Sequence, residues 1–247
     1  MSNLHDRTNV KAARNDLLAA MSEDDLLALK PHLEPCAFAR GEALFRQGEH
    51  VEFITFPCER LVISLRVTSA EGVACEVASV GREGAIGCIV SQGDAPAFAT
   101  ASAQTRGAGW RVSAARLDEL KARSASLRRL FARYADGLLA QLMQKAACNA
   151  LHDVERRIAS WLIGLQDRVG GHAIPVTQDD VAMALGVGRP YASRQLNAMK
   201  QKGLLDLRRG MIHIRSRATL ERSACGCHRA VKAHFKATMA GVRARAD

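Results

Sequence analysis

Two arginines in the C-terminal half carry the clearest chemical signal in this sequence. Arg189 and Arg194 are five positions apart, so in a helix they share roughly one face near its N-terminal end. A guanidinium group can form two parallel hydrogen bonds to guanine in the major groove of DNA. Helices that read DNA present such side chains at their N-terminal ends, and this pair therefore indicates direct base recognition.

The residues around this pair predict two short helices across a tight turn. Thr177 and Asp180 have the spacing of a capping box, which predicts a helix that begins at Gln178. Gly186-Val187-Gly188 is a turn of the length that joins the helices of a helix-turn-helix. Pro190 suits the first turn of the second helix.

A wing is predicted directly after the second helix. Leu204 to Leu207 and Met211 to Ile214 read as short strands around the turn Arg208-Arg209-Gly210. Residues 177–217 carry eight Lys or Arg and three Asp, a net charge of +5. A helix pair with a glycine turn also occurs in other helical domains, but the wing and the charge favour DNA binding. The candidate DNA contacts are Thr177, Gln178, Arg189, Pro190, Tyr191, Ser193, Arg194, Arg208 and Arg209.

The positive charge of the chain lies in its C-terminal half. Residues 1–125 carry 14 Lys or Arg and 16 Asp or Glu, net −2, whereas residues 126–247 carry 21 and 9, net +12. This asymmetry predicts a domain that binds a polyanion, joined to a domain with another task. A membrane surface is the alternative partner, yet no segment approaches about 18 uninterrupted apolar residues and the N-terminus lacks a signal-peptide core. We therefore expect a soluble, cytoplasmic protein with no membrane partner.

The N-terminal half reads as an all-β domain with helical flanks. Ser22 caps a short helix that runs through Leu29. Short apolar runs between glycines then continue to about Val112, which favours a small barrel or roll, although spacing alone leaves another kind of β-sandwich open. The best strands are Phe53 to Phe56, Leu61 to Val67, Val73 to Val80 and Gly109 to Val112.

Two helices are predicted between the halves, at Ser113 to Ala122 and at about Ser126 to Ala150. The longer helix has an apolar stripe, and such a stripe is most often buried within its own domain. A dimer contact is the better interpretation here, because a two-fold symmetric DNA reader needs two recognition helices about one turn of DNA apart. The candidate dimer-interface residues are Leu127, Phe131, Tyr134, Leu138 and Leu142.

The order of these parts resembles the Crp/Fnr family of bacterial transcription regulators. The resemblance extends from about residue 22 to residue 215 and is most specific over Leu151 to Ile214, which contains LHDVERRIASWLI and TQDDVAMALGVGR. It implies an α+β fold in three parts. These are an N-terminal cyclic-nucleotide-binding-like β-roll over residues 1–125, a dimerisation helix over 126–150, and a C-terminal winged helix-turn-helix with a helical tail over 151–247.

The resemblance also implies a homodimeric, sequence-specific regulator of transcription without enzymatic activity. Its partners would be double-stranded DNA, RNA polymerase and a small-molecule effector. In the family the recognition helix typically begins with Arg-Glu and has a second Arg five positions after the first, and Arg189 and Arg194 match these arginines. Pro190 stands where Glu is common, which removes an acceptor for the amino group of cytosine. The operator therefore need not be the family's usual half-site.

The residues that grip a cyclic nucleotide in this family are replaced. Its binders carry Phe-Gly-Glu-Leu followed after about ten residues by Arg-Ser or Arg-Thr, whereas this chain has Ala85-Ile86-Gly87-Cys88-Ile89 and then Phe98-Ala99. The phosphate would lose charge-assisted hydrogen bonds worth about 1.5–3 kcal/mol each. The sequence thus argues against cAMP or cGMP, while nearby Arg82 and Arg106 leave a substitute partner open. The candidate effector-pocket residues are Arg82, Gly87, Cys88, Phe98 and Ala99.

Seven cysteines are scattered along the chain. Residues 1–35 contain none, which argues against the N-terminal iron–sulfur cluster of Fnr-type oxygen sensors. Cys225, Cys227 and His228 are the tightest group, but they lack the separated Cys-x2-Cys pairs typical of a zinc site. We therefore interpret the cysteines as small buried hydrophobes, with a redox or metal role as the alternative. The sequence predicts no metal site and neither indicates nor excludes haem.

A second class of function is an enzyme or ligand-binding protein whose basic half attracts an acidic substrate. The sequence shows no nucleophile–base constellation, no glycine-rich phosphate loop and no metal-binding motif. We therefore expect a DNA-binding regulator.

Overall fold

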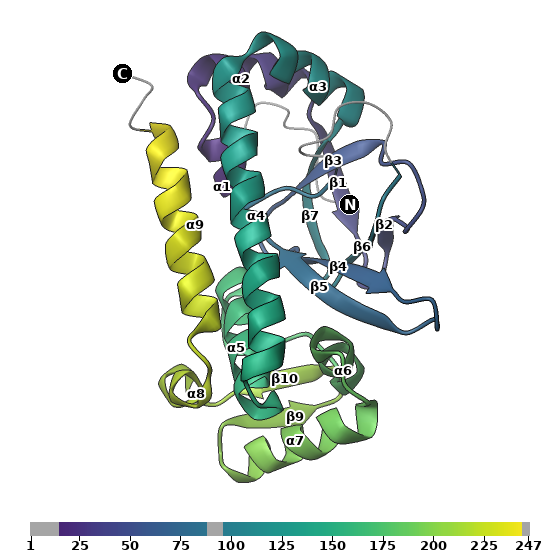
Figure 1. Cartoon of the computed structure of the whole chain (residues 1–247), viewed down its shortest axis with the longest axis vertical. Helices are drawn as coiled ribbons and strands as arrows, with labels where there is room; N and C mark the ends of the chain where they lie inside the picture. The colour runs from purple at the N-terminus through teal and green to yellow at the C-terminus, as the bar shows by residue number, and fades with distance from the viewer. Residues whose placement is uncertain (1–14, 88–95, 244–247) are drawn as a thin grey trace, which may run out of the picture.

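Antiparallel strands build the N-terminal domain in the computed structural model of the chain, which describes residues 15–87 and 96–243. One sheet has the order β1-β7-β3 and the other the order β2-β6-β4-β5 (Figure 1). The strands are β1 (Glu34–Phe38), β2 (Ala43–Phe45), β3 (Phe53–Pro57), β4 (Ile63–Thr68), β5 (Ala74–Val80), β6 (Thr100–Ala103) and β7 (Gly107–Ser113).

The four strands expected from the sequence are present as β3, β4, β5 and β7, whereas β1, β2 and β6 were missed. Each missed strand has a local reason. β1 contains Pro35 and pairs with one neighbour only, β2 has three residues, and β6 reads TASA without a large apolar side chain. Their pairing partners, not their own pattern, make them strands.

Helices flank this roll at both ends. They are α1 (Asp16–Ala19), α2 (Glu23–Leu29), which leads into a 3-10 turn at Lys30–His32, α3 (Ala114–Arg123) and the long α4 (Ala125–Leu151). Ser22 caps α2 as expected, because its side chain accepts a hydrogen bond from the amide of Asp25. The predicted short and long connecting helices are thus confirmed as α3 and α4.

The first half of α4 packs into the core of the roll. Phe131 meets Phe56 edge to face, with ring centroids 6.5 Å apart. The buried hydroxyl of Tyr134 donates to the carbonyl of Ala85 at 2.8 Å and accepts from its amide at 2.9 Å. Gly84 allows this contact, because a Cβ there would lie 2.1 Å from that hydroxyl.

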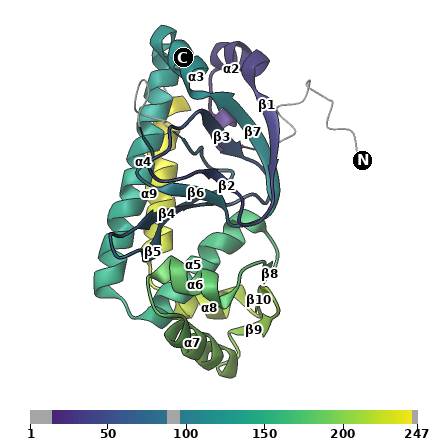
Figure 2. The ribbon, with the colours of Figure 1, turned by 90° about the vertical axis from the view of Figure 1, so that its right-hand side faces the viewer.

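The C-terminal domain lies beneath the roll (Figure 2), and its hydrophobic core also includes Val62 of the roll. Its elements are α5 (Val154–Val169), β8 (Ala173–Ile174), α6 (Gln178–Leu185), α7 (Arg189–Gln201), β9 (Leu205–Arg208), β10 (Met211–Ile214) and α8 (Arg217–Ser223). The strands form one sheet in the order β8-β10-β9. The sequence pattern did not predict β8, which has only two residues.

A last helix, α9 (Cys227–Arg243), runs back along α4 (Figure 1). The ring of Phe235 packs edge to face on Tyr134, with centroids 6.0 Å apart. Gly137 lets the helices approach closely, since a Cβ there would lie 2.6 Å from the ring of Phe235. One face of α4 is therefore covered by its own chain.

Among the described residues, no helix combines the length and the apolar character needed to cross a membrane.

Candidate DNA-binding surface and neighbouring sites

The turn between α6 and α7 has the local chemistry that the sequence predicted. The carboxylate of Asp180 accepts from the amide of Thr177 at 2.6 Å, and the Thr177 hydroxyl accepts from the amide of Asp180 at 3.2 Å. Gly186 ends α6 at φ +64°, in the left-handed region that favours glycine. Gly188 then caps α7, with Pro190 in its first turn.

The second helix, α7, has one buried face and one open face. Ala192, Leu196 and Met199 are fully buried in the domain core. The outer face carries Arg189 and Arg194 exposed. This division leaves the outer side chains free to enter a groove of DNA while the inner ones fix the helix.

The two arginines of the outer face have different neighbours. Arg189 forms an ion pair with Asp179 of α6 at 2.9 Å, and Arg194 lies over the ring of Tyr191 with its guanidinium carbon 5.7 Å from the ring centroid. These contacts are exposed, so each is weak and can yield to a base or a phosphate. Pro190 and Tyr191 are exposed as well, whereas Thr177, Gln178 and Ser193 are half-buried.

The wing is a two-stranded hairpin with arginines at its tip. Arg208 pairs with Met211 across a turn at Arg209-Gly210, where Gly210 has φ +71°. Arg208 and Arg209 are both exposed. An ion pair also stabilises the hairpin, because the Arg215 guanidinium donates to both carboxylate oxygens of Asp206 at 2.8 and 2.9 Å.

The apolar stripe expected to form the dimer interface lies mostly inside this chain. Leu127, Phe131 and Tyr134 are 1–2% exposed in the core of the roll, and Leu138 is half-buried against the same core. Only Leu142 is open, at 39% exposed. The sequence correctly predicted the helical period of the stripe. Its first residues contact the roll of the same chain and not a second copy, because the first turns of α4 complete the hydrophobic core of the roll.

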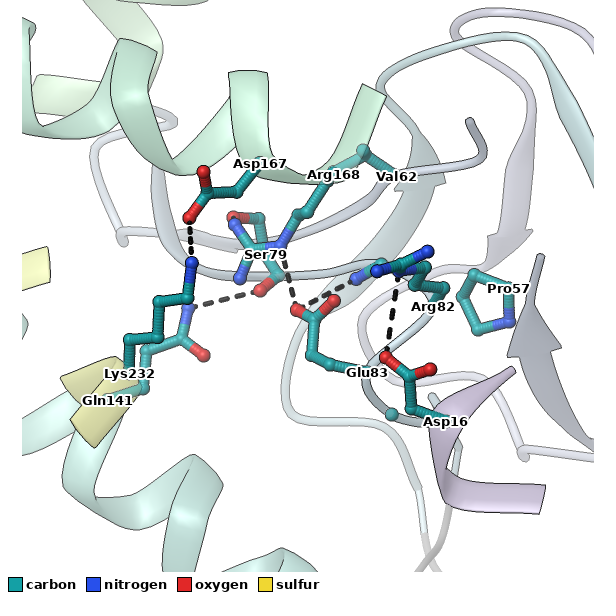
Figure 3. A network of polar contacts seen from close by, with 12 residues as sticks. Asp16, Pro57, Val62, Ser79, Arg82, Glu83, Gln141, Asp167, Arg168 and Lys232 are labelled. Carbon is teal, nitrogen blue, oxygen red and sulfur yellow. Dashed lines mark hydrogen bonds and ion pairs between the residues drawn. The ribbon is translucent and has the colours of Figure 1, made fainter. Parts of the chain in front are cut away.

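The candidate effector-pocket residues that the structure describes differ in their surroundings. Phe98 is 79% exposed on the surface, and Cys88 lies outside the described residues. Arg82 points to Asp16 of α1, with Nε 3.6 Å from the carboxylate (Figure 3). This ion pair is exposed and therefore weak, so it does not prevent the Arg82 guanidinium from binding another anion. Gly87 and Ala99 are half-buried.

Two cavities lie where the roll meets the C-terminal half. One, of about 290 Å³, is lined by residues from β5, α4, α5 and α9. The other, of about 320 Å³, lies between the roll and α6 and is lined by Arg40, Ser64, Arg66, Glu76, Gln104, Asp180 and four further residues. The side-chain carbonyl of Gln104 is buried there without a hydrogen-bond partner among the residues that the structure describes.

Trp161 and Arg168 of helix α5 form polar contacts with the roll that the sequence pattern did not predict. The Trp161 indole donates to buried Glu76 at 2.9 Å, and Arg168 donates to Glu83 at 2.7 Å (Figure 3). Each pair is separated by 85 residues. No local pattern could have revealed them, because the partners meet only once both domains have folded.

Asp167 of α5 forms polar contacts with basic side chains of the last two helices, α8 and α9. It accepts from Arg217 at 2.6 Å and from Lys232 at 2.6 Å, and it lies 3.0 Å from the His228 ring nitrogen. Burial alone would raise the pKa of Asp167, but the hydrogen bonds from Lys232, His228 and Arg217 hold that pKa well below its usual value. His228 is therefore engaged here and not with Cys227.

The C-terminal domain is similar to a known protein family. Residues 156–223 match the family model of the Crp-like helix-turn-helix domain. The comparison with curated proteins found no match.

Solved structures extend the likeness to most of the chain. FixK2 from Bradyrhizobium japonicum has 15% identity and a TM-score of 0.66, covering 78% of this chain and 98% of its own. The c-di-GMP-responsive global regulator CLP from Xanthomonas campestris has 17% identity and a TM-score of 0.65, covering 79% and 100%. A CRP-family regulator from Thermus thermophilus has 20% identity and a TM-score of 0.65, covering 76% and 96%.

At these identities the similar structures establish the fold, and the family model establishes the nature of the domain that carries α6 and α7. Residues 156–223 thus form a Crp-like helix-turn-helix domain, and the chain has the fold of these solved regulators, as the resemblance of its sequence to the Crp/Fnr family implied.

Proposed function

We propose that the protein is a homodimeric, sequence-specific DNA-binding regulator of transcription that acts in the cytoplasm together with RNA polymerase. The observation that carries this proposal is the outer face of α7, where Arg189 and Arg194 are exposed beside an arginine-tipped wing. Exposed guanidinium groups on a helix whose other face is fully packed can read guanine in the major groove. The role is one of binding and not of catalysis.

The dimer contact is proposed for the open side of α4. An exposed stripe there is built from small and apolar residues together with the charged Asp136, and its other members are Ala132, Leu139, Leu142, Met143, Ala146 and Ala150. These positions recur at steps of three and four, so they share one face of the helix. A second copy of the chain would bury this stripe and give the two recognition helices a two-fold axis.

The proposed signal is a ligand other than cAMP that acts at the roll. The cavity between the roll and α6 supports this proposal, because it brings Arg66 and Glu76 of the sheet next to Asp180 and Met183 of α6. A ligand in that position would contact both domains. It would then favour one orientation of the DNA-binding domain by its differential affinity for the two arrangements.

Selection from a pool of random duplexes, followed by a mobility-shift titration, tests the proposed function. We expect enrichment of a sequence with two inverted half-sites about 10 base pairs apart from centre to centre, bound by two chains. Failure to enrich any sequence, with binding only to arbitrary polyanions, would contradict the proposal and favour a protein whose basic half attracts an acidic substrate.

A further inference from the structure

Four ligand-type side chains from distant parts of the chain converge at the end of α4. The sulfur atoms of Cys148 and Cys225 are 3.6 Å apart, and the Cys227 sulfur is 3.5 Å from Nδ1 of His152. All four ligand atoms lie within 4.8 Å of one another. The three sulfurs are therefore neighbours but not bonded, since a disulfide would require about 2.05 Å.

The Cys148–Cys225 and Cys227–His152 spacings match edges of one coordination tetrahedron, and the other pairs of ligand atoms lie within 4.8 Å. Zinc–sulfur bonds of about 2.3 Å at tetrahedral angles place two ligand sulfurs about 3.8 Å apart. A cluster of several irons binds its cysteines through different iron atoms, so it needs ligand atoms farther apart than in this group. The geometry thus favours a single ion.

Two segments of the chain, the end of α4 and the start of α9, supply the four candidate ligands. Cys148 lies in the last turn of α4, and His152 caps the C-terminus of this helix, where its amide donates to the carbonyl of Cys148 at 3.1 Å. Cys225 and Cys227 flank Gly226 immediately before and at the start of α9. The first turn of α9 thus places the Cys227 sulfur beside the His152 ring.

The three cysteines are buried, and two of them have a hydrogen-bonding side chain beside the sulfur. Cys148, Cys225 and Cys227 are 8%, 3% and 9% exposed and form a small buried cluster of their own. The side-chain amide of Gln144 donates to the Cys227 sulfur at 3.3 Å, and Ser160 forms a hydrogen bond with Cys225. Hydrogen-bond donors around a metal site orient its ligands and stabilise their charge.

We propose that Cys148, His152, Cys225 and Cys227 bind one Zn²⁺ ion in a closed structural site. Three thiolates and an imidazole are a preferred ligand set of zinc, and four protein ligands leave no open position for catalysis. The ion would tie the start of α9 and the end of the winged domain to the end of α4. It would therefore stabilise the junction at Asp153, where the DNA-binding domain follows the long helix.

This assignment corrects the interpretation of Cys225, Cys227 and His228 as a local group. His228 contacts Asp167 instead, 3.0 Å away. The missing ligands come from α4, 77 residues before Cys225 in the case of Cys148. The paired spacing that a zinc site requires exists only in the folded chain.

Metal analysis of the untagged wild-type protein provides the first test. We expect about one zinc per chain, with neither stoichiometric iron nor acid-labile sulfide. After Co²⁺ replaces the zinc, the absorption spectrum should show intense ligand-field bands in the red region, which indicate a tetrahedral ion. It should also show a charge-transfer band from thiolate to cobalt. Absence of zinc together with an octahedral cobalt spectrum, or the presence of iron with sulfide, would overturn the proposal.

Matched variants locate the ion. Cys148→Ser and Cys225→Ser should each weaken zinc binding by more than about 100-fold, beyond the ~10–100-fold cost of losing a residue that only orients a ligand. His228→Gln, adjacent in sequence but outside the tetrahedron, and Cys36→Ser on β1 should keep one zinc per chain. If His228→Gln loses zinc while Cys148→Ser retains it, the ion is bound elsewhere and the assignment is wrong.

Discussion

Exposed arginines in the DNA-binding domain occupy two chemically different positions. Arg194 lies on the outer face of α7, over the ring of Tyr191, whereas Arg209 is at the tip of the wing. A recognition helix reaches base edges, while a wing follows the backbone of the duplex. We therefore expect Arg194 to contribute specificity and Arg209 to contribute general affinity.

Replacing each of these arginines separates the two roles. Arg194→Ala should weaken binding to the selected operator by about 1–3 kcal/mol and relax the preference at one position. Arg209→Ala should weaken operator and scrambled duplex alike and lower the salt dependence of binding by about one unit. Anisotropy titrations of both duplexes at several salt concentrations measure this. Equal weakening of both duplexes by Arg194→Ala would reverse the assignment.

Single residues were predictable from the sequence where their partners are close along the chain. The capping box of Thr177 and Asp180 spans three residues, and the structure contains both of its hydrogen bonds. The convergence of Cys148 with Cys225 spans 77 residues and was missed. Local chemistry is encoded in spacing, whereas a site built from distant elements depends on how the chain folds.

Among the elements, α9 depends most clearly on one partly buried acid, Asp167. Asp167 of α5 accepts hydrogen bonds from Arg217 of α8 and Lys232 of α9, so it joins the last two helices to the domain core. The pKa of Asp167 is lowered in the folded state because these hydrogen bonds outweigh the cost of burial. A carboxylate of this kind stabilises the fold while it is ionised.

We expect Asp167→Asn to lower the free energy of unfolding by about 1–3 kcal/mol at neutral pH, because two cations lose their shared acceptor. The loss should shrink as the pH falls below the usual aspartate pKa of 3.8, because Asp167 of the wild type is then protonated in the unfolded state, and it should vanish once the folded carboxylate is protonated at a much lower pH. Urea unfolding at several pH values measures the difference. Glu221→Gln, which removes an exposed partner of the same Arg217, is the control and should cost at most about 0.5 kcal/mol. A difference between wild type and Asp167→Asn that grows in acid would contradict this account.

The helical period of α4 was predictable, but the division of its faces was not. The predicted stripe through Leu127, Phe131 and Tyr134 became core of the roll, because α4 packs against Phe56 and its neighbours. A stripe of apolar residues specifies a buried face. It does not specify whether that face meets the same chain or a second copy.

A charge on the open face of α4 tests the proposed dimer. Met143→Glu should convert the dimer to monomer at micromolar concentration, because a carboxylate would be buried without a partner in the seam. Leu27→Glu on α2 is the matched control, since both side chains are 62% exposed in the single chain, and it should leave the dimer intact. Sedimentation equilibrium provides the measurement. A wild-type protein that is monomeric and still specific for its operator would rule out the proposed dimer.

For the whole molecule, the order of the parts was predictable but their docking was not. The roll, the long helix and the winged helix follow one another as expected. The contacts of Trp161 with Glu76, and of Arg40 with Asp180, join the two halves across 85 and 140 residues. Such contacts determine how the DNA-binding domain is held, and they arise from surfaces that no local pattern reveals.

We expect millimolar cAMP to change neither the melting temperature nor the affinity for DNA. Phe98, which stands where the cyclic-nucleotide binders of the family have arginine, is 79% exposed and carries no charge for a phosphate. A ligand that binds only the folded state at 100 times its dissociation constant would add about 2.7 kcal/mol of stability. Differential scanning fluorimetry would show this as a clear rise in melting temperature. Such a rise would mean that Arg106 or another group binds the phosphate.

The ratio of specific to non-specific DNA affinity tests the central claim most directly. The selected operator and a scrambled duplex of equal length and composition should be titrated with the wild-type protein at one near-physiological salt concentration. The account predicts that the operator binds about 10³–10⁷ times more tightly, as expected when Arg189 and Arg194 of α7 read base edges. Equal affinity for the two duplexes would show that the basic half merely attracts polyanions, and would contradict the account.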